Sequence, residues 1–319
     1  MSNPHTPGHE IPLVVAERTE AADGVAVLTL RHPHGEPLPQ WQPGAHIELL
    51  LDNGLVRHYS LCGAPGDRSA WRIGVLHAPE GRGGSAYVHA KLHVDVEVRT
   101  RTPRNNFALR PARRYLFIAG GIGITPILPM LAAVEAAGAH WRLLYGGRSR
   151  SSMAFLDELA GYGEAVTVHP QDRHGLLDID DYLGDPDPET LVYCCGPEPL
   201  LAAVEERCRA WPDRALQVER FQAKAQGVPS RGAFEVVLDR SGITVQVAPE
   251  RSVLDAVREA GVAALSSCAE GICGTCETEV LDGEPDHRDS VLSAEERESD
   301  EIMMICVSRS RGPRLVLDL

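Results

Sequence analysis

Apolar and polar residues alternate in short stretches along the first 110 residues, and turn-forming pairs such as Asp23-Gly24 and Pro43-Gly44 separate these stretches. Alternation with a period of two is typical of strands with one buried face. Because no long helical period interrupts the stretches, the pattern predicts an antiparallel β-barrel. The predicted strands are 13–16, 25–30, 46–51, 58–62, 72–76 and 94–98.

The pattern changes at Arg114, where apolar strand-like runs begin to alternate with stretches of helical period. Strands that alternate with helices through short loops predict a parallel sheet with helices on both faces. The predicted strands are 115–119, 141–146, 165–169 and 190–194, and the predicted helices are 126–137, 153–160, 176–183 and one from Pro197 to about Arg209.

A polar, turn-rich segment at 224–232 predicts a linker to a third unit. In that unit, two alternating runs flank the turn residues 239–242 and predict a hairpin. The next stretch, 252–260, predicts a helix capped by Ser252 and ended by Gly261. The chain is therefore predicted to be multidomain: an antiparallel barrel (1–110), an α/β domain with a parallel sheet (111–223), the linker (224–232) and a small α+β domain (233–319).

Composition and charge narrow the function classes. The chain of 319 residues is 43% hydrophobic and 24% charged, which is typical of soluble globular proteins. Its formal net charge is −14, and residues 232–319 alone hold 18 acidic and eight basic side chains. Such acidity argues against nucleic acid or an anionic membrane as the main partner.

Two segments bear on membrane association, and neither indicates a membrane protein. The first 15 residues lack the basic and apolar regions of a secretory signal, so a cytoplasmic protein is expected. Residues 116–134 carry no charge over a length that could span a bilayer. Three glycines and two prolines interrupt that segment, which favours a buried strand, a tight turn and a helix instead.

The last unit contains a cysteine pattern with a specific chemical meaning. Three cysteines follow the spacing CxxxxCxxC and a fourth lies 30 positions later, the plant-type ligand set of a [2Fe–2S] cluster. Glycines 271 and 274 would let the loop curl around a small inorganic core. Zinc usually takes paired CxxC or Cys/His spacings and disulfides are uncommon inside cells, so both alternatives are less favoured, though neither is excluded. The four cysteines are Cys268, Cys273, Cys276 and Cys306.

Residues 120–126, GGIGITP, connect a predicted strand to a predicted helix. A glycine turn at that place lets backbone N–H groups and the helix N-terminus face a pyrophosphate, with Thr125 as the cap and Pro126 in the first turn. The motif alone also fits an ordinary tight turn. Residues 195–197, CGP, end another predicted parallel strand, where ligands of open α/β sheets bind, and so strengthen the dinucleotide interpretation.

The second predicted strand of this domain is not followed by the acidic residue that binds a ribose 2′-hydroxyl. Arg148 and Arg150 stand there instead, and arginines at this place favour the 2′-phosphate of NADPH. The choice between NADH and NADPH is left open by these residues.

In the barrel, residues 57–61 (RHYSL) lie on a predicted strand and residues 81–85 (GRGGS) open a predicted helix at Ala86. An arginine, a ring and a hydroxyl beside a glycine turn with free N–H groups can bind a phosphorylated cofactor. An ordinary strand and loop would also fit this pattern.

Taken together, the chain resembles the phthalate dioxygenase reductase and vanillate demethylase reductase family. The resemblance covers nearly the whole chain and rests on RxYSL, GGS, PRNNF (103–107), GGIGITP, YGGR, CGP, ERF (219–221) and the cysteine spacing, in that order. It implies an FMN-binding barrel, an NAD-binding domain and a C-terminal plant-type ferredoxin domain of β-grasp fold. FMN rather than FAD rests on this resemblance alone.

The resemblance also implies residue roles. Ser60 would lie near the reactive nitrogen of the flavin, Cys195 near the nicotinamide, and Phe221 over the flavin or its surroundings. NADH is the implied donor, while NADPH stays possible. The implied flavin contacts are Arg57, Tyr59, Ser60, His77, Gly83, Gly84 and Ser85, and the implied dinucleotide contacts are Gly121, Gly123, Thr125, Pro126, Arg148, Cys195, Gly196 and Pro197.

These parts predict an NADH-dependent reductase that feeds a separate Rieske-type terminal oxygenase. NADH gives electrons in pairs, a [2Fe–2S] cluster accepts one at a time, and a flavin handles both. Plant-type clusters lie near about −400 mV and Rieske clusters at about −150 mV or higher, so transfer gains at least roughly 250 mV. The acidic last domain is either the docking face or plain solvated surface.

Two other functions fit the same residues. The acceptor could be a cytochrome P450, which no residue distinguishes from a Rieske oxygenase. A module that binds a nucleotide and is stabilised by zinc, with no turnover, is the alternative from another class.

Overall fold

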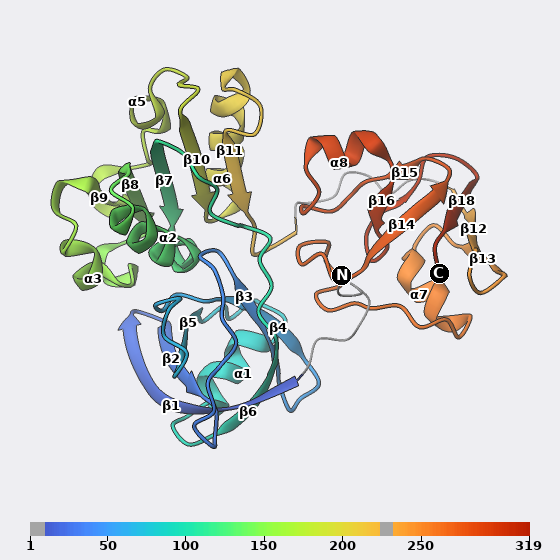
Figure 1. Ribbon diagram of the computed structural model, residues 1–319, viewed down its shortest axis with the longest axis horizontal. Coiled ribbons are helices and arrows are strands. Elements are labelled where there is room, and N and C mark those ends of the chain that lie inside the picture. The colour runs from blue at the N-terminus through green and yellow to red at the C-terminus, as the bar shows by residue number, and fades with distance from the viewer. Residues whose placement is uncertain (1–9, 224–231) are drawn as a thin grey trace. The chain divides into compact units, whose positions relative to one another are not determined.

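The computed structural model describes residues 10–223 and 232–319 (Figure 1). The chain divides into two compact units, one ending at Glu219 and the other beginning at Arg220. Most of the predicted linker, residues 224–231, lies outside the described residues. The predicted boundary between residues 110 and 111 falls inside the first unit, between β6 (Glu97–Arg101) and β7 (Arg114–Gly120), and stays a prediction.

The first half of the first unit is the predicted antiparallel barrel. Its six strands follow the order β4-β3-β6-β1-β2-β5, and a bridge between Leu61 and Ile73 joins the two ends of the sheet. Inward side chains such as Trp71 and Leu28 fill the barrel. The elements are β1 (Glu10–Ala22), β2 (Val25–Arg31), β3 (His46–Leu50), β4 (Val56–Ser60), β5 (Trp71–Leu76), α1 (Gly84–Lys91) and β6.

One predicted strand of the barrel is displaced. Residues 94–96 were expected to begin a strand, but they form a turn and the strand starts at Glu97. Asp95 has a φ of 68°, and the Val96 N–H bonds to the His93 carbonyl, so the chain reverses there. The apolar alternation predicted a strand close to the observed β6, but hydrogen bonding within the turn sets the residue at which the strand begins.

The second half of the first unit contains the predicted parallel sheet, with strand order β11-β10-β7-β8-β9. Neighbouring residues of β7 face opposite cores: Phe117 packs with α2, whereas Ile118 packs with α5 and α6. The elements are β7, α2 (Ile124–Ala136), β8 (His140–Gly147), α3 (Leu156–Ala160), β9 (Val166–Pro170), α4 (Gln171–His174), α5 (Ile179–Leu183), β10 (Thr190–Cys195), α6 (Glu198–Arg207) and β11 (Leu216–Glu219), with 3₁₀ turns at 121–123, 150–152, 163–165 and 208–210.

Strand β11 was not predicted. It has four half-buried residues and pairs in parallel with β10, and in this pairing Glu219 lies opposite Cys195. A strand this short, without an alternating apolar pattern, gives little sequence signal.

The strand order places a topological switch point between β7 and β10. The chain proceeds from β7 to β8 and β9 on one side, then returns to β10 and β11 on the other. Loops that leave the carboxyl ends of β7 and β10 therefore run to opposite sides and open a crevice between them. Both predicted dinucleotide motifs begin at these two strand ends.

The second unit has a mixed sheet with strand order β13-β12-β18-β14-β16, in which β12 and β18 are parallel. The predicted hairpin and helix are confirmed: the Ser252 hydroxyl accepts the Asp255 N–H at the start of α7, and Gly261 follows its end with a φ of 83°. The elements are β12 (Phe234–Leu238), β13 (Ile243–Val247), α7 (Val253–Glu259), β14 (Glu277–Asp282), β15 (Pro285–Asp286), α8 (Ala294–Ser299), β16 (Ile302–Met304), β17 (Arg309–Ser310) and β18 (Arg314–Leu317).

Among the described residues, no helix is both long and apolar enough to span a bilayer. Residues 116–134, which raised that question in the sequence, form most of β7, a 3₁₀ turn and most of α2, as predicted.

Candidate functional site

The glycine turn of the barrel is built around Arg57. A Cβ on Gly84 would lie 2.2 Å from Nε of Arg57, so only glycine allows the guanidinium to pass this close to the start of α1. The guanidinium donates to the carbonyls of Val56 (2.8 Å) and Arg82 (2.7 Å), which hold it against the turn. Gly83, just before the helix, has a φ of 77°.

This turn has the features of a phosphate site. No side chain caps the start of α1, so its first N–H groups remain available beside the charge of Arg57. The Ser85 hydroxyl accepts the Ala78 N–H at 3.0 Å, which ties the turn to the end of β5. His77 precedes Ala78 and is exposed, with its ring 5.1 Å from that of His89. The predicted flavin residues of the turn thus lie together.

Tyr59 and Ser60 are the last two residues of β4, and Tyr59 lies two positions after Arg57. Burial raises the pKa of Tyr59 to about 12, although the Arg57 charge partly opposes the rise, so the phenol stays neutral. Ser60 is buried, and its hydroxyl points toward the parallel sheet, as the contact described below shows.

Close backbone approach joins the two predicted dinucleotide motifs at the switch point. A Cβ on Gly123 would lie 2.2 Å from the Cys195 carbonyl oxygen, and one on Gly120 would lie 2.6 Å from the Pro197 ring. Gly196 is also closely packed, because its Cβ would lie 3.0 Å from Gly120. Glycines are therefore required here to let the ends of β7 and β10 meet.

The predicted helix cap is wrong. The 3₁₀ turn 121–123 leads directly into α2, so Thr125 is already inside the helix and its hydroxyl donates to the Ile122 carbonyl at 2.9 Å. Pro126 is the third residue of α2 and is buried. Gly121 has a φ of 55° and open space around its Cα.

Arg148 and Arg150 follow β8 and are exposed. The Asp172 N–H bonds to the Arg148 carbonyl at 3.0 Å and links this loop to α4. Their role in choosing between NADH and NADPH stays a prediction.

Ser60 of the barrel and Cys195 of the parallel sheet meet at one carboxylate. The Ser60 hydroxyl donates to Oε2 of Glu219 at 3.4 Å, and the Cys195 thiol lies 4.0 Å from the same oxygen. Burial raises the pKa of Glu219 to about 8, partly opposed by the Ser60 hydrogen bond. Burial, followed by the nearby Glu219, also raises the pKa of Cys195, so its sulfur stays a thiol.

Glu219 was not assigned a role from the sequence. It appeared there only as part of the ERF motif, in which Phe221 carried the prediction. The signal that could have found it is the pairing of β11 with β10, which sets Glu219 opposite Cys195. Phe221 belongs to the second unit, is 37% exposed, and its place over the flavin stays a prediction.

The four predicted cluster ligands are brought together in the second unit. All four cysteines are buried, and their thiols contact one another in the pairs 268–273, 268–306 and 276–306. Hydrogen bonds from the thiols of Cys273 and Cys306, and from the N–H groups of Ile272 and Glu270, lower the pKa of Cys268. Such donors also suit thiolates that bind iron.

The described residues hold no group of three His, Cys, Asp or Glu side chains arranged around a single ion. The contacts 268–273 and 276–306 match the cysteines two by two, and the contact 268–306 joins these two pairs. Each iron of a [2Fe–2S] cluster takes two protein ligands. The donor set and its pairing therefore fit a binuclear cluster.

The loop around these cysteines needs its glycines. Gly271 has a φ of 69°, and a Cβ there would lie 2.5 Å from Val307 and 3.0 Å from the Cα of Asp289. Gly274 has a φ of 73°. These positions let the chain curl between the first three cysteines, as the sequence predicted.

Comparison with protein families finds two matching domains. Residues 117–206 match the oxidoreductase NAD-binding domain, and residues 236–311 match the 2Fe-2S iron-sulfur cluster binding domain. The first match spans the switch point of the parallel sheet, and the second includes all four cysteines.

Individual relatives match over nearly the full chain. A putative toluene-4-sulfonate monooxygenase system reductase subunit of Comamonas testosteroni is 42% identical over 97% of this chain and 99% of its own. The structure of phthalate dioxygenase reductase, described as modular for electron transfer from pyridine nucleotides to [2Fe-2S], is 35% identical over 97% and 98%, with a TM-score of 0.72.

The structure of an intact type IV self-sufficient cytochrome P450 monooxygenase is also similar, with 45% identity and a TM-score of 0.91. The match covers 100% of this chain but 43% of that protein.

Proposed function

The chain belongs to the phthalate dioxygenase reductase and vanillate demethylase reductase family, and from this we propose that it carries electrons from NADH, through FMN and a [2Fe–2S] cluster, to a Rieske-type terminal oxygenase. It is an oxidoreductase with an NAD-binding and a 2Fe-2S domain. The terminal oxygenase is a separate protein in this proposal.

One observation carries the proposal. Ser60 from the flavin-site strand and Cys195 from the dinucleotide switch point contact the same Glu219 carboxylate. A phosphate turn in the barrel and a dinucleotide crevice in the sheet therefore open toward one place. That arrangement suits direct transfer between two bound cofactors, because reacting atoms must approach to about 3–3.5 Å.

The chain's own residues have distinct tasks. Arg57 and the N–H groups after Gly83 bind the flavin phosphate, and Tyr59 packs against the cofactor. The turn at 121–123 and the CGP segment hold the dinucleotide. Ser60 and Cys195 supply neutral hydrogen-bonding groups where the nicotinamide meets the flavin, and Glu219 holds a proton between them.

The flavin, when bound, supplies the conversion of paired electrons into single ones. The four cysteines would hold the [2Fe–2S] cluster, which would supply a one-electron carrier. Their burial keeps water away from the sulfurs, and the N–H donors around Cys268 stabilise negative charge on them. Delivery is favourable whenever the partner's potential is higher, as for a Rieske centre.

A cytochrome P450 is the second candidate acceptor, and a specific observation favours it. The self-sufficient P450 monooxygenase contains a region that matches this entire chain with a TM-score of 0.91. A reductase of this architecture can therefore be joined to a P450 in one polypeptide.

Reconstitution separates these functions. Purified protein loaded with FMN, iron and sulfide is mixed with NADH and either a Rieske oxygenase or a P450, and acceptor reduction is followed under anaerobic conditions. Faster reduction of the Rieske centre supports the first candidate, and faster reduction of the haem supports the second. Protein that binds one zinc and no iron or sulfide, and does not oxidise NADH, would contradict both.

We also propose that the protein works in the cytoplasm. All eight cysteines are free thiols and four of them must stay reduced to bind iron, which a reducing compartment with NADH supports. Activity in a cytoplasmic fraction of the source cells would test this.

A further inference from the structure

The barrel and the parallel sheet share one hydrophobic core within the first unit. Val25, Val27 and Cys62 of the barrel pack in the same cluster as α2 and Phe155 of the sheet domain. The Asp23 N–H also donates to the Ser151 carbonyl at 2.8 Å. We call this interface between the barrel and the sheet domain the seam. At its edge, a cleft of about 500 Å³ opens to solvent.

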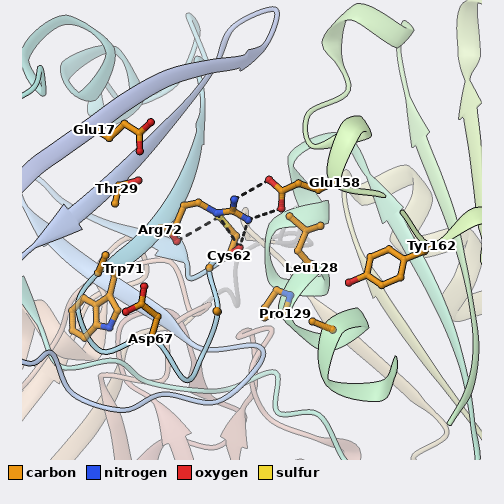
Figure 2. A pocket seen from close by; sticks show the side chains of 14 residues that line it. Glu17, Thr29, Cys62, Asp67, Trp71, Arg72, Leu128, Pro129, Glu158 and Tyr162 are labelled. Atoms are coloured by element: carbon orange, nitrogen blue, oxygen red, sulfur yellow. Dashed lines mark hydrogen bonds and ion pairs between the residues drawn. The ribbon is translucent and has the colours of Figure 1, made fainter. Parts of the chain in front are cut away.

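Arg72 crosses the seam beside this cleft (Figure 2). Its guanidinium, on β5, donates both Nη1 and Nη2 to the carboxylate of Glu158, on α3, at 2.8 Å each. The same guanidinium lies over the Phe155 ring, 5.3 Å from its centroid. A bidentate pair of this kind fixes direction as well as distance between the two elements. We call Arg72 and Glu158 the seam pair.

The guanidinium is already held in place on the barrel side. Nε and Nη2 of Arg72 donate to the Cys62 carbonyl at 3.2 and 2.7 Å. In return, the Cys62 N–H donates to the Arg72 carbonyl at 2.8 Å, and so does its thiol at 3.4 Å. Because the Arg72 side chain is already ordered, it loses less conformational entropy when it pairs with Glu158. The pair therefore stabilises the interface more than an ordinary surface ion pair would.

The seam pair is attached to both cofactor sites through short stretches of chain. Cys62 lies two residues after Ser60, at the flavin site. Gly74 lies two residues after Arg72, and a Cβ there would be 2.9 Å from Thr125 of the dinucleotide turn. A shift of β5 against α3 would therefore move the flavin strand relative to the dinucleotide turn.

We propose that Arg72 and Glu158 are positioning residues, which set the distance between the flavin site and the nicotinamide site for hydride transfer. This inference rests on the proposed function. A misplacement of about 1 Å between reacting groups can cost about 100-fold in rate. The shared core limits the movement, so we expect about a tenfold loss, equal to about 1.4 kcal/mol.

The test uses the full chain loaded with FMN and cluster. Arg72→Gln, Glu158→Gln and the double variant are mixed with NADH in an anaerobic stopped-flow instrument, and flavin bleaching is recorded. The matched control is Arg99→Gln, because Arg99 of β6 forms an exposed 2.8 Å pair with Glu10 of β1, both within the barrel domain and away from the seam. The rate at saturating NADH should fall about tenfold in the seam variants and stay unchanged in the control.

Two further readouts separate positioning from mere stability. The NADH dissociation constant should change by less than about twofold, while the isotope effect with NADH deuterated at the transferred position should persist or grow. The double variant should be no slower than the slower of the two single variants, because both lose the interaction between Arg72 and Glu158. If Arg72→Gln folds poorly, Glu158→Gln, whose side chain is 47% exposed, provides the test alone.

Unchanged rates in Glu158→Gln, additive losses in the double variant, or an equal loss in Arg99→Gln would overturn the inference. If NADH fails to bleach the flavin of the wild-type protein, the proposed function itself is contradicted. The two failures are therefore distinguishable.

Discussion

Replacing Glu219 by Gln tests how the chain prepares the place where its two cofactor sites meet. Burial raises the pKa of Glu219 from 4.5 to about 8, against the smaller opposing effect of the Ser60 hydrogen bond. That difference of about 3.5 units corresponds to about 5 kcal/mol in favour of the neutral acid. Roughly nine in ten molecules therefore hold a protonated Glu219 at pH 7, and about one in ten at pH 9.

The sign of the effect on folding stability follows from the pH at which the folded and the unfolded chain each release the Glu219 proton. Unfolded chains release the Glu219 proton near pH 4.5, whereas the folded chain keeps it until about pH 8. The contribution of this group to stability therefore falls as pH rises from about 4.5 to 8 and is constant above that range. Glu219→Gln lacks this loss, so its stability relative to wild type should increase between pH 5 and pH 9, by at most about 5 kcal/mol.

Two assays follow this proton. Infrared difference spectra of wild type should show a protonated carboxyl band at pH 7 that disappears by pH 9 and is missing in Glu219→Gln. Oxidised nicotinamide carries a positive charge, so inhibition by NAD⁺ should strengthen roughly tenfold over the same range in wild type, because the ionised carboxylate attracts it. The variant should show no such change. Identical infrared bands and identical pH profiles for the two proteins would refute the reasoning.

Three other substitutions test the remaining parts of the site. Gly123→Ala would place a Cβ 2.2 Å from the carbonyl at the end of β10, so NADH should bind at least tenfold more weakly. Gly66→Ala, in open space and likewise without a positive φ, is the control, and equal binding by both would contradict the close packing. Gly84→Ala should push Arg57 aside and release FMN on gel filtration, and full flavin retention would argue against the phosphate turn. Cys306→Ser should lose the visible spectrum of the cluster while NADH-driven dye reduction survives; loss of both in folded protein would contradict separate cofactor sites.

Much of the fold could be predicted because each domain has its own periodicity. The antiparallel and parallel sheets follow from periods of two and from strand–helix alternation, and the cysteine loop follows from spacing alone. Turn glycines were also informative, since Gly84 and Gly123 stand where no Cβ fits. These signals are local in sequence, so a single amino-acid sequence is enough to detect them.

Features that depend on distant pairing could not be predicted. Glu219 gains its raised pKa from burial at the end of β11, which pairs with β10, and the Ser60 hydroxyl that partly opposes the rise lies 159 positions away. Arg72 and Glu158 are separated by 86 positions and match no motif. Thr125 fitted a capping position in the sequence, but the preceding 3₁₀ turn moved the helix start to Ile124. Each of these depends on tertiary contacts rather than on a local pattern.

Anaerobic reduction of the reconstituted chain by NADH tests the relay most directly. Flavin absorbance and the paramagnetic signal of the cluster are recorded in the same sample as NADH is added. The proposed relay requires that the flavin bleaches and that the reduced-cluster signal then appears without any added mediator. A flavin that stays oxidised, or one that bleaches while the cluster remains silent at excess NADH, would contradict it.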